Sequence, residues 1–212
     1  MSLGGHARYE HFIRPVPARR AMEKPVRQEL IVFAAFTMLA CAIAIASLIA
    51  SPGRLGVFGG GLGILMDAIA VKDGRSFIIP DRLTLAAFAL GLANAANANY
   101  EGIPDNIASA ALRGVLLALA FYLLREIYYR LRRRHGIGLG DIKLAAAAGA
   151  WLDWTLIPTA IELTALAALG FYAVSRLLLR RPFDAAAKLP FGLFFAPAIW
   201  VCWLLDAIFL KS

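Results

Sequence analysis

Residues 30–51 read LIVFAAFTMLACAIAIASLIAS, a run of 22 residues without a charged side chain. A helix needs about 20 apolar residues to cross the hydrocarbon core of a bilayer. The whole chain of 212 residues is 60% hydrophobic and 17% charged, and a soluble domain of this size cannot bury so much apolar surface. The sequence therefore predicts an integral membrane protein.

Further apolar runs follow this one, and their lengths predict an all-α, polytopic membrane helix bundle. The fifth run is short for a crossing. Small residues such as those at 59–61 and 145–148 are expected to let neighbouring helices approach closely. We predict seven transmembrane helices, at about 30–51, 55–72, 82–99, 106–129, 141–152, 155–178 and 189–210.

Lysine and arginine gather in alternate connections, at 8–27, 72–82, 125–143 and 176–188. The other connections carry few basic residues or acidic ones, and the C-terminus has only Lys211. By the positive-inside rule, this pattern places the N-terminus in the cytoplasm and the C-terminus outside. The basic residues that give the chain its net charge of +8 thus flank membrane spans, and nucleic acid is not an expected partner.

Two parts of different composition follow one another along the chain. Residues 1–28 are polar and contain Pro15, Pro17, Pro25 and several arginines, so we expect a basic cytoplasmic tail. The apolar run after them exceeds the core of a secretory signal, which favours a retained helix. Residues 29–212 then form a single membrane domain.

Residues 136–144 read GIGLGDIKL and place Asp141 at the mouth of the fifth apolar run. An ionisable residue at a membrane edge is a candidate functional group. Gly136, Gly138 and Gly140 remove side-chain bulk, so a substrate backbone could approach Asp141. The alternative is a flexible glycine loop in which Asp141 caps a helix.

A second carboxylate, Asp73, ends the second predicted span on the same side of the bilayer. Asp67 competes with it, but a separation of six residues puts Asp67 about 9 Å deeper on a helix. We prefer Asp73 because Pro80 predicts an extended stretch and a new helix start just after it, which gives a hydrated boundary. Asp81 is expected to be a helix N-terminal charge.

The remaining candidates have structural interpretations. Glu162 and Asp206 fall in the outer half of the membrane, where buried polar residues tether helices. Cys41 and Cys202 lie inside apolar spans, form no zinc motif and are expected to be small buried hydrophobes. We therefore expect neither a metal nor another cofactor.

Two carboxylates that share a partly dry site cannot both ionise cheaply, so one keeps its proton. The ionised member can take a proton from water while the protonated member polarises a peptide carbonyl. Asp73 and Asp141 together therefore predict an aspartic protease at the membrane surface.

At these residues the chain resembles the type IV prepilin peptidases, which are aspartic membrane proteases of the GxGD type related to the preflagellin peptidases. Three blocks carry the resemblance: DGRSFIIPDRLTL at 73–85, GIGLGDIKL at 136–144 and LPFG at 189–192. Together they extend the resemblance over 55–210.

The resemblance implies that a bacterial inner-membrane enzyme removes the short basic leader from prepilin or pseudopilin precursors at the cytoplasmic face. It assigns catalysis to Asp73 and Asp141, and motif support to Lys143, Pro80, Pro190 and Gly192. Bifunctional members carry an N-terminal domain with paired CxxC motifs. Here a cysteine-free tail and one helix added to a six-helix core stand in its place, which is typical of the peptidase-only branch and not of an N-methyltransferase.

Two other functions compete with this one. A non-catalytic membrane subunit of a pilus or type II secretion machine could keep the fold, but it has no physical reason to keep a like-charge pair. A transporter could use intramembrane carboxylates as a proton relay, but the chain shows no repeated halves. The sequence does not indicate an oligomeric state.

Overall fold

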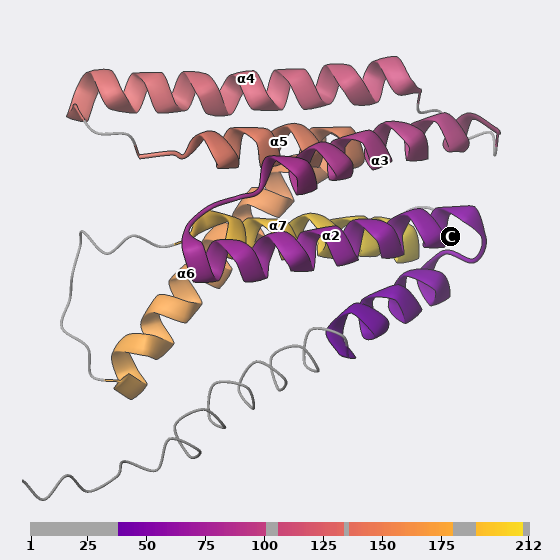
Figure 1. Ribbon diagram of the computed structural model, residues 1–212, viewed down its shortest axis with the longest axis horizontal. Helices are drawn as coiled ribbons and strands as arrows, with labels where there is room; N and C mark the ends of the chain where they lie inside the picture. The colour runs from indigo at the N-terminus through magenta and orange to yellow at the C-terminus, as the bar shows by residue number, and fades with distance from the viewer. Residues whose placement is uncertain (1–37, 101–105, 134–135, 180–189, 210–212) are drawn as a thin grey trace, which may run out of the picture. The chain divides into compact units, whose positions relative to one another are not determined.

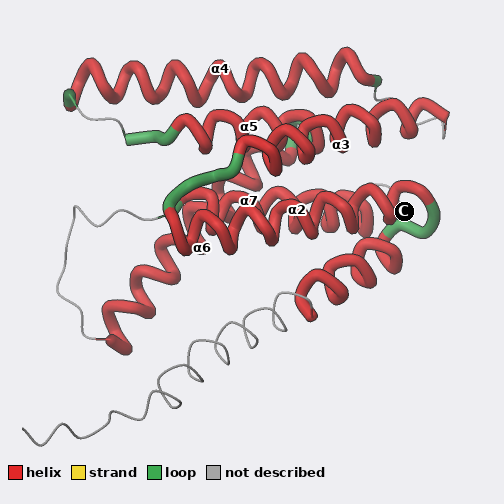
Figure 2. Tube along the Cα trace, viewed as in Figure 1, coloured by secondary structure: helices red, strands yellow, loops and turns green. Residues whose placement is uncertain are grey.

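The computed structural model describes residues 38–100, 106–133, 136–179 and 190–209, and every regular element in these ranges is a helix (Figures 1 and 2). The tail at 1–28 and the beginning of the first apolar run lie outside the described residues. The first described helix is Met38–Ala50. It is followed by α2 (Arg54–Ser76), α3 (Asp81–Tyr100), α4 (Ile107–Arg132), α5 (Leu139–Trp151), α6 (Leu156–Leu179) and α7 (Phe191–Phe209).

Each of these helices lies on a predicted span, so the all-α prediction is confirmed. Several helices extend past the predicted apolar boundary: α2 continues to Ser76, α4 continues to Arg132, and α5 begins at Leu139. Lysine and arginine are good helix formers, and their long side chains can carry the charge away from apolar surroundings. The boundary of an apolar run is therefore not the end of the helix.

Among the described residues, four helices are long and apolar enough to cross a membrane: α2, α4, the part Leu156–Val174 of α6, and α7. The chain is thus a multi-pass membrane protein. Helix α5 has 13 residues and is about 20 Å long at 1.5 Å per residue, short of the roughly 30 Å hydrocarbon core. Seven crossings, and the orientation of the termini, stay predictions.

Helix α5 lies at the centre of the packing (Figure 1). It contacts α3, α4 and α7, while α2 packs against α3 and α7, and α6 packs against α7. Buried apolar residues from α2, α5 and α7 form one continuous core with residues of the other helices. From Leu39 onward the described residues form one compact unit.

Glycines allow the closest helix contacts, as the small-residue runs predicted. A Cβ on Gly149 of α5 would lie 2.6 Å from the backbone oxygen of Arg113 on α4. A Cβ on Gly59 of α2 would lie 1.8 Å from the Trp203 ring of α7. Any side chain at either position would force the two helices apart.

Candidate functional site

Four helix ends meet at one end of the bundle, at the left of Figure 1. They are the C-terminal end of α2 and the N-terminal ends of α3, α5 and α7. The three sequence blocks at 73–85, 136–144 and 189–192 supply these ends, apart from Leu189, which lies outside the described residues. The fold therefore brings together residues that are more than a hundred positions apart in the sequence.

Asp73 lies in the last turn of α2 and is buried, with 5% of its surface exposed. The expectation that the helix ends at Asp73 and leaves it at a hydrated boundary is therefore wrong. The helix ends at Ser76, after which Phe77 adopts a left-handed conformation and donates its N–H to the Asp73 backbone oxygen at 2.8 Å. Pro80 disfavours helical geometry in the residue before it, which keeps α2 and α3 separate.

The carboxylate of Asp73 is held at the N-terminus of α7. The backbone N–H of Leu193, the third residue of that helix, donates to Asp73 Oδ2 at 3.0 Å. The N–H of Gly192 is a second backbone donor to the same carboxylate. The first N–H groups of a helix have no partner within the helix, so they provide a natural site for a negative charge.

Asp141 lies in the first turn of α5, where its Oδ2 accepts a hydrogen bond from the Gly138 N–H at 2.9 Å. The alternative drawn from sequence, that Asp141 caps a helix, is thus confirmed as local geometry. Capping does not exclude a chemical role, because an ionised carboxylate offers about four acceptor positions. Asp141 is half-buried, more accessible than Asp73.

Burial raises the pKa of Asp141, and the negative charge of Asp73 raises it further, while the hydrogen bond from Gly138 opposes both effects. Helix α5 is not among the described helices that are long and apolar enough to span the membrane. The influence of Asp73 on Asp141 indicates that the two carboxylates share one electrostatic environment. Asp73 and Asp141 thus lie at the same end of the bundle, and their action as a catalytic pair stays a prediction.

Each glycine before Asp141 has a packing reason to be glycine. A Cβ on Gly136 would lie 2.9 Å from the Tyr128 ring, and one on Gly138 would lie 3.1 Å from Asp141 Oδ2. A Cβ on Gly140 would lie 2.8 Å from the Cβ of Ile79. The approach of a substrate backbone to this loop stays a prediction.

The remaining motif residues lie around the same helix ends. Pro80 directly precedes α3, and Pro190 directly precedes α7. Asp81 begins α3, as predicted, and its Oδ1 also pairs with the Lys143 ammonium of α5. The Asp81 and Lys143 side chains are 73% and 47% exposed, so this ion pair links the two aspartate blocks at the surface.

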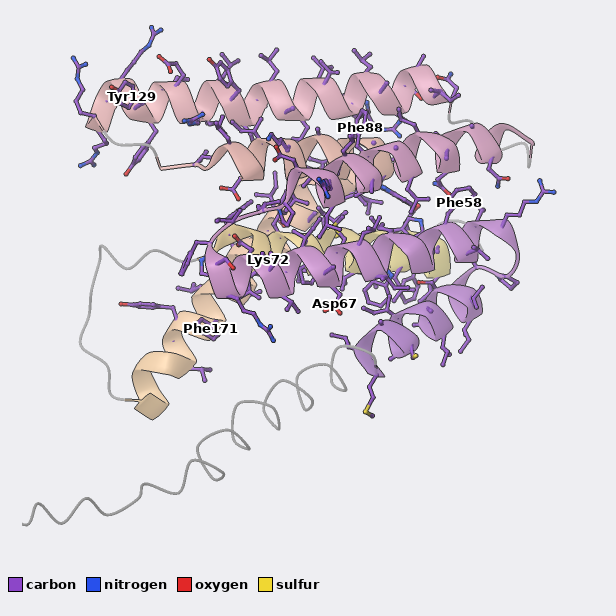
Figure 3. The ribbon with its side chains drawn as sticks, in the orientation of Figure 1. Phe58, Asp67, Lys72, Phe88, Tyr129 and Phe171 are labelled. Carbon is purple, nitrogen blue, oxygen red and sulfur yellow. The ribbon has the colours of Figure 1, made fainter. Side chains whose placement is uncertain are left out.

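The other acidic candidates are separate from the pair. Asp67 is 8% exposed, and its Oδ2 has no hydrogen-bond partner among the described residues. Figure 3 places it farther along α2 from the loop to α3 than Lys72, the residue beside Asp73. Glu162 is exposed on α6, so its prediction as a buried tether is wrong, whereas Asp206 is buried in α7.

A cavity of about 350 Å³ opens between α3 and α5. Residues two apart on a helix are separated by about 200° around its axis, so Lys143 and Asp141 lie on nearly opposite sides of α5. The cavity is on the Lys143 side and is therefore distinct from the aspartate pair. It is lined by Asp81, Thr84, Leu85, Phe88, Lys143 and Ala146.

Sequence reasoning did not single out two residues that support this site. Ile79 packs beside both aspartate blocks, and Arg113 of α4 is buried with 5% exposure. Arg113 Nε donates to the Gly149 carbonyl at 3.2 Å, near the end of α5, and Nη1 lies 3.6 Å from Asp153 Oδ1. An arginine within a predicted apolar span was the available signal.

The sequence model of the type IV leader peptidase family matches residues 61–173 of this chain. Leader peptidase HopD of Escherichia coli is 35% identical over 129 residues, which cover 61% of this chain and 80% of that protein. Leader peptidase HopD of Salmonella typhimurium is 34% identical over 131 residues, covering 61% of this chain and 81% of that protein.

A longer relative is also similar. The prepilin leader peptidase/N-methyltransferase of Escherichia coli K12 is 32% identical over 119 residues, 56% of this chain and 51% of that protein. No solved structure matches the chain. The matched region contains Asp73 and Asp141 together with the helices that carry them.

Proposed function

Because the chain belongs to the type IV leader peptidase family, we propose that it is a membrane aspartic endopeptidase that removes the short basic leader from prepilin or pseudopilin precursors. The names of its relatives support leader cleavage. The observation that supports the aspartic mechanism is that carboxylates from two separate blocks lie at one end of the bundle, with Asp73 at the N-terminus of α7 and Asp141 at that of α5.

The proposed mechanism uses one proton shared by the pair. We assign Asp73 as the ionised member, because backbone donors at the N-terminus of α7 stabilise its charged form and oppose the effect of its burial. Asp73 takes a proton from water as the water oxygen attacks the scissile carbonyl carbon. Asp141 donates its proton to the carbonyl oxygen. Collapse of the tetrahedral intermediate then returns that proton to Asp141, while the proton held by Asp73 moves to the leaving amine.

We place the reaction at the cytoplasmic face of the bacterial inner membrane. The support is the charge pattern, because the helix ends that carry the pair are bordered by the basic stretches at 72–82 and 125–143. Such stretches remain on the cytoplasmic side of a membrane. A leader with its own basic residues is held on that side for the same reason.

The proposal is confined to peptide cleavage. The chain has two cysteines, Cys41 and Cys202, and neither belongs to a CxxC motif. The aligned region covers 51% of the bifunctional relative, so the methyl-transfer activity in that protein's name is not carried over.

Co-expression with a prepilin in a host that lacks its own leader peptidase tests the proposal. Removal of the leader produces a mobility shift on a gel. Asp73→Asn and Asp141→Asn should each abolish the shift, because asparagine keeps the shape of the side chain but cannot exchange the proton. Membrane fractionation confirms that each variant is inserted.

Asp67→Asn is the matched control, since it lies on the same helix and is also buried. It should retain cleavage. If Asp67→Asn abolishes cleavage while Asp73→Asn retains it, the pair is wrongly assigned. If the wild-type chain inserts but cleaves no precursor, a non-catalytic assembly subunit becomes the better interpretation.

A further inference from the structure

Ile79 lies between the two glycines that adjoin the aspartates. It is 8% exposed and belongs to the segment between α2 and α3. A Cβ on Gly140 would lie 2.8 Å from Ile79 Cβ, and one on Gly192 would lie 2.8 Å from Ile79 Cδ1. One side chain therefore fills the space beside both α5 and α7.

Each of these glycines is next to one of the carboxylates. Gly140 directly precedes Asp141 in the chain. A Cβ on Gly192 would also lie 2.9 Å from Asp73 Oδ2. Ile79 thus contacts the backbone that carries Asp141 on one side and the backbone that holds the Asp73 carboxylate on the other.

The segment that carries Ile79 is fixed at both of its ends. At one end, the Phe77 N–H donates to the Asp73 backbone oxygen at 2.8 Å. At the other end, Asp81 pairs with Lys143, two residues after Asp141. Between them, Phe77 and Ile78 are 58% and 61% exposed, whereas Ile79 is buried. Of these three side chains, Ile79 alone points into the site.

We propose that Ile79 is a positioning residue that sets the separation between Asp73 and Asp141. This inference rests on the proposed function, in which both carboxylates act on one substrate bond. Ile79 does not touch the reacting atoms. It acts by filling the space between α5 and α7, and protein interiors transmit such volume changes because they are closely packed.

Substitutions at position 79 test this role in the full-length protein, assayed in membranes with a prepilin substrate. Ile79→Ala removes the contact with Gly192 and should lower kcat about a hundredfold, which is the effect of misplacing catalytic groups by about 1 Å. KM should change less than about threefold. A loss confined to kcat indicates an interaction that matters in the transition state. Ile79→Val loses Cδ1, the atom beside Gly192, but keeps Cβ and Cγ carbons beside Gly140. Its kcat should therefore lie between those of Ile79→Ala and the wild type.

The pH profile provides a readout that a loss of folded protein would not change. A coupled pair of carboxylates titrates with two macroscopic pKa values. The pH interval between the two limbs of the profile therefore reports the repulsion between the carboxylates. Ile79→Ala should alter that separation, whereas a smaller amount of correctly folded enzyme lowers the whole curve without changing its shape.

Ile78→Ala is the matched control, since it changes the same residue type in the same segment at an exposed position. It should keep the wild-type rate and profile. Asp73→Asn and Asp141→Asn are measured beside it. If those two variants cleave, the proposed function fails. If they are inactive but Ile79→Ala keeps the wild-type kcat and pH profile, only the positioning role is overturned.

Discussion

Glycines beside the aspartate pair are crowded, because a Cβ added to Gly140 or Gly192 would lie less than 3 Å from a neighbouring atom. Gly192 is the clearest example, because a Cβ there would lie 2.9 Å from Asp73 Oδ2 and 2.8 Å from Ile79 Cδ1. Gly170 of α6 differs, with no atom within 4 Å of the equivalent position. The two glycines therefore allow a direct comparison of crowding.

We expect Gly192→Ala to lower the cleavage rate about a hundredfold, because the new methyl group displaces the Asp73 carboxylate by a substantial fraction of an ångström. Gly170→Ala should leave the rate unchanged and add up to about 1 kcal/mol of helix stability. Cleavage rates and thermal unfolding in detergent measure both effects. Equal rates for Gly192→Ala and wild type would show that the α7 N-terminus does not position Asp73.

The protonation of Asp141 predicts the shape of the pH profile. Its pKa is raised by burial and by the charge of Asp73, so Asp141 keeps its proton to a higher pH than an ordinary aspartate. Cleavage should decrease as Asp141 loses its proton, at a pH above the ordinary aspartate value of 3.8. A profile with one acidic limb and no decline at higher pH would contradict the shared proton.

At the scale of helices, α5 is the element whose placement decides the site. Its N-terminal turn carries Asp141, and its C-terminal turn is held by the buried Arg113 side chain of α4 through the Gly149 carbonyl. The last carbonyls of a helix have no partner within it. A short helix with both ends fixed gives the carboxylate a defined location.

Arg113→Met should lower the free energy of unfolding by about 1–3 kcal/mol, because the substitution leaves a buried carbonyl without this donor. Arg130→Met is the control. Arg130 lies on the same helix, is 76% exposed and pairs with Glu126, so its loss should change stability by less than about 1 kcal/mol. If both variants unfold at the wild-type temperature, α5 does not depend on this hydrogen bond.

For the molecule as a whole, the number of membrane crossings and the sides on which the termini lie are predictions. Within the described ranges, four helices are long and apolar enough to cross the membrane, and the charge pattern of the whole chain predicts seven crossings. A reporter fused after Arg134 or Arg181 should report the cytoplasm, and one fused after Glu101 or Ser212 should report the outside. A cytoplasmic C-terminus would mean that one predicted span, most simply the short α5, does not cross.

Apolar runs were enough to predict the helical membrane class, and glycine-spaced carboxylates indicated the aspartate blocks, because both are local patterns. Pro80 also predicted a new helix start close to where α3 begins, since proline restricts the backbone beside it.

Other features of the site arise only when the helices pack together, and no local pattern encodes them. Asp73 is buried, helix α2 continues past it, and its carboxylate lies against the N-terminus of α7. Glu162 is exposed. Ile79 lies between two glycines that are 52 positions apart in the sequence. The physical reason is that burial and backbone donors at a site come from whichever helices pack there, and helix packing depends on side-chain shapes across the whole bundle.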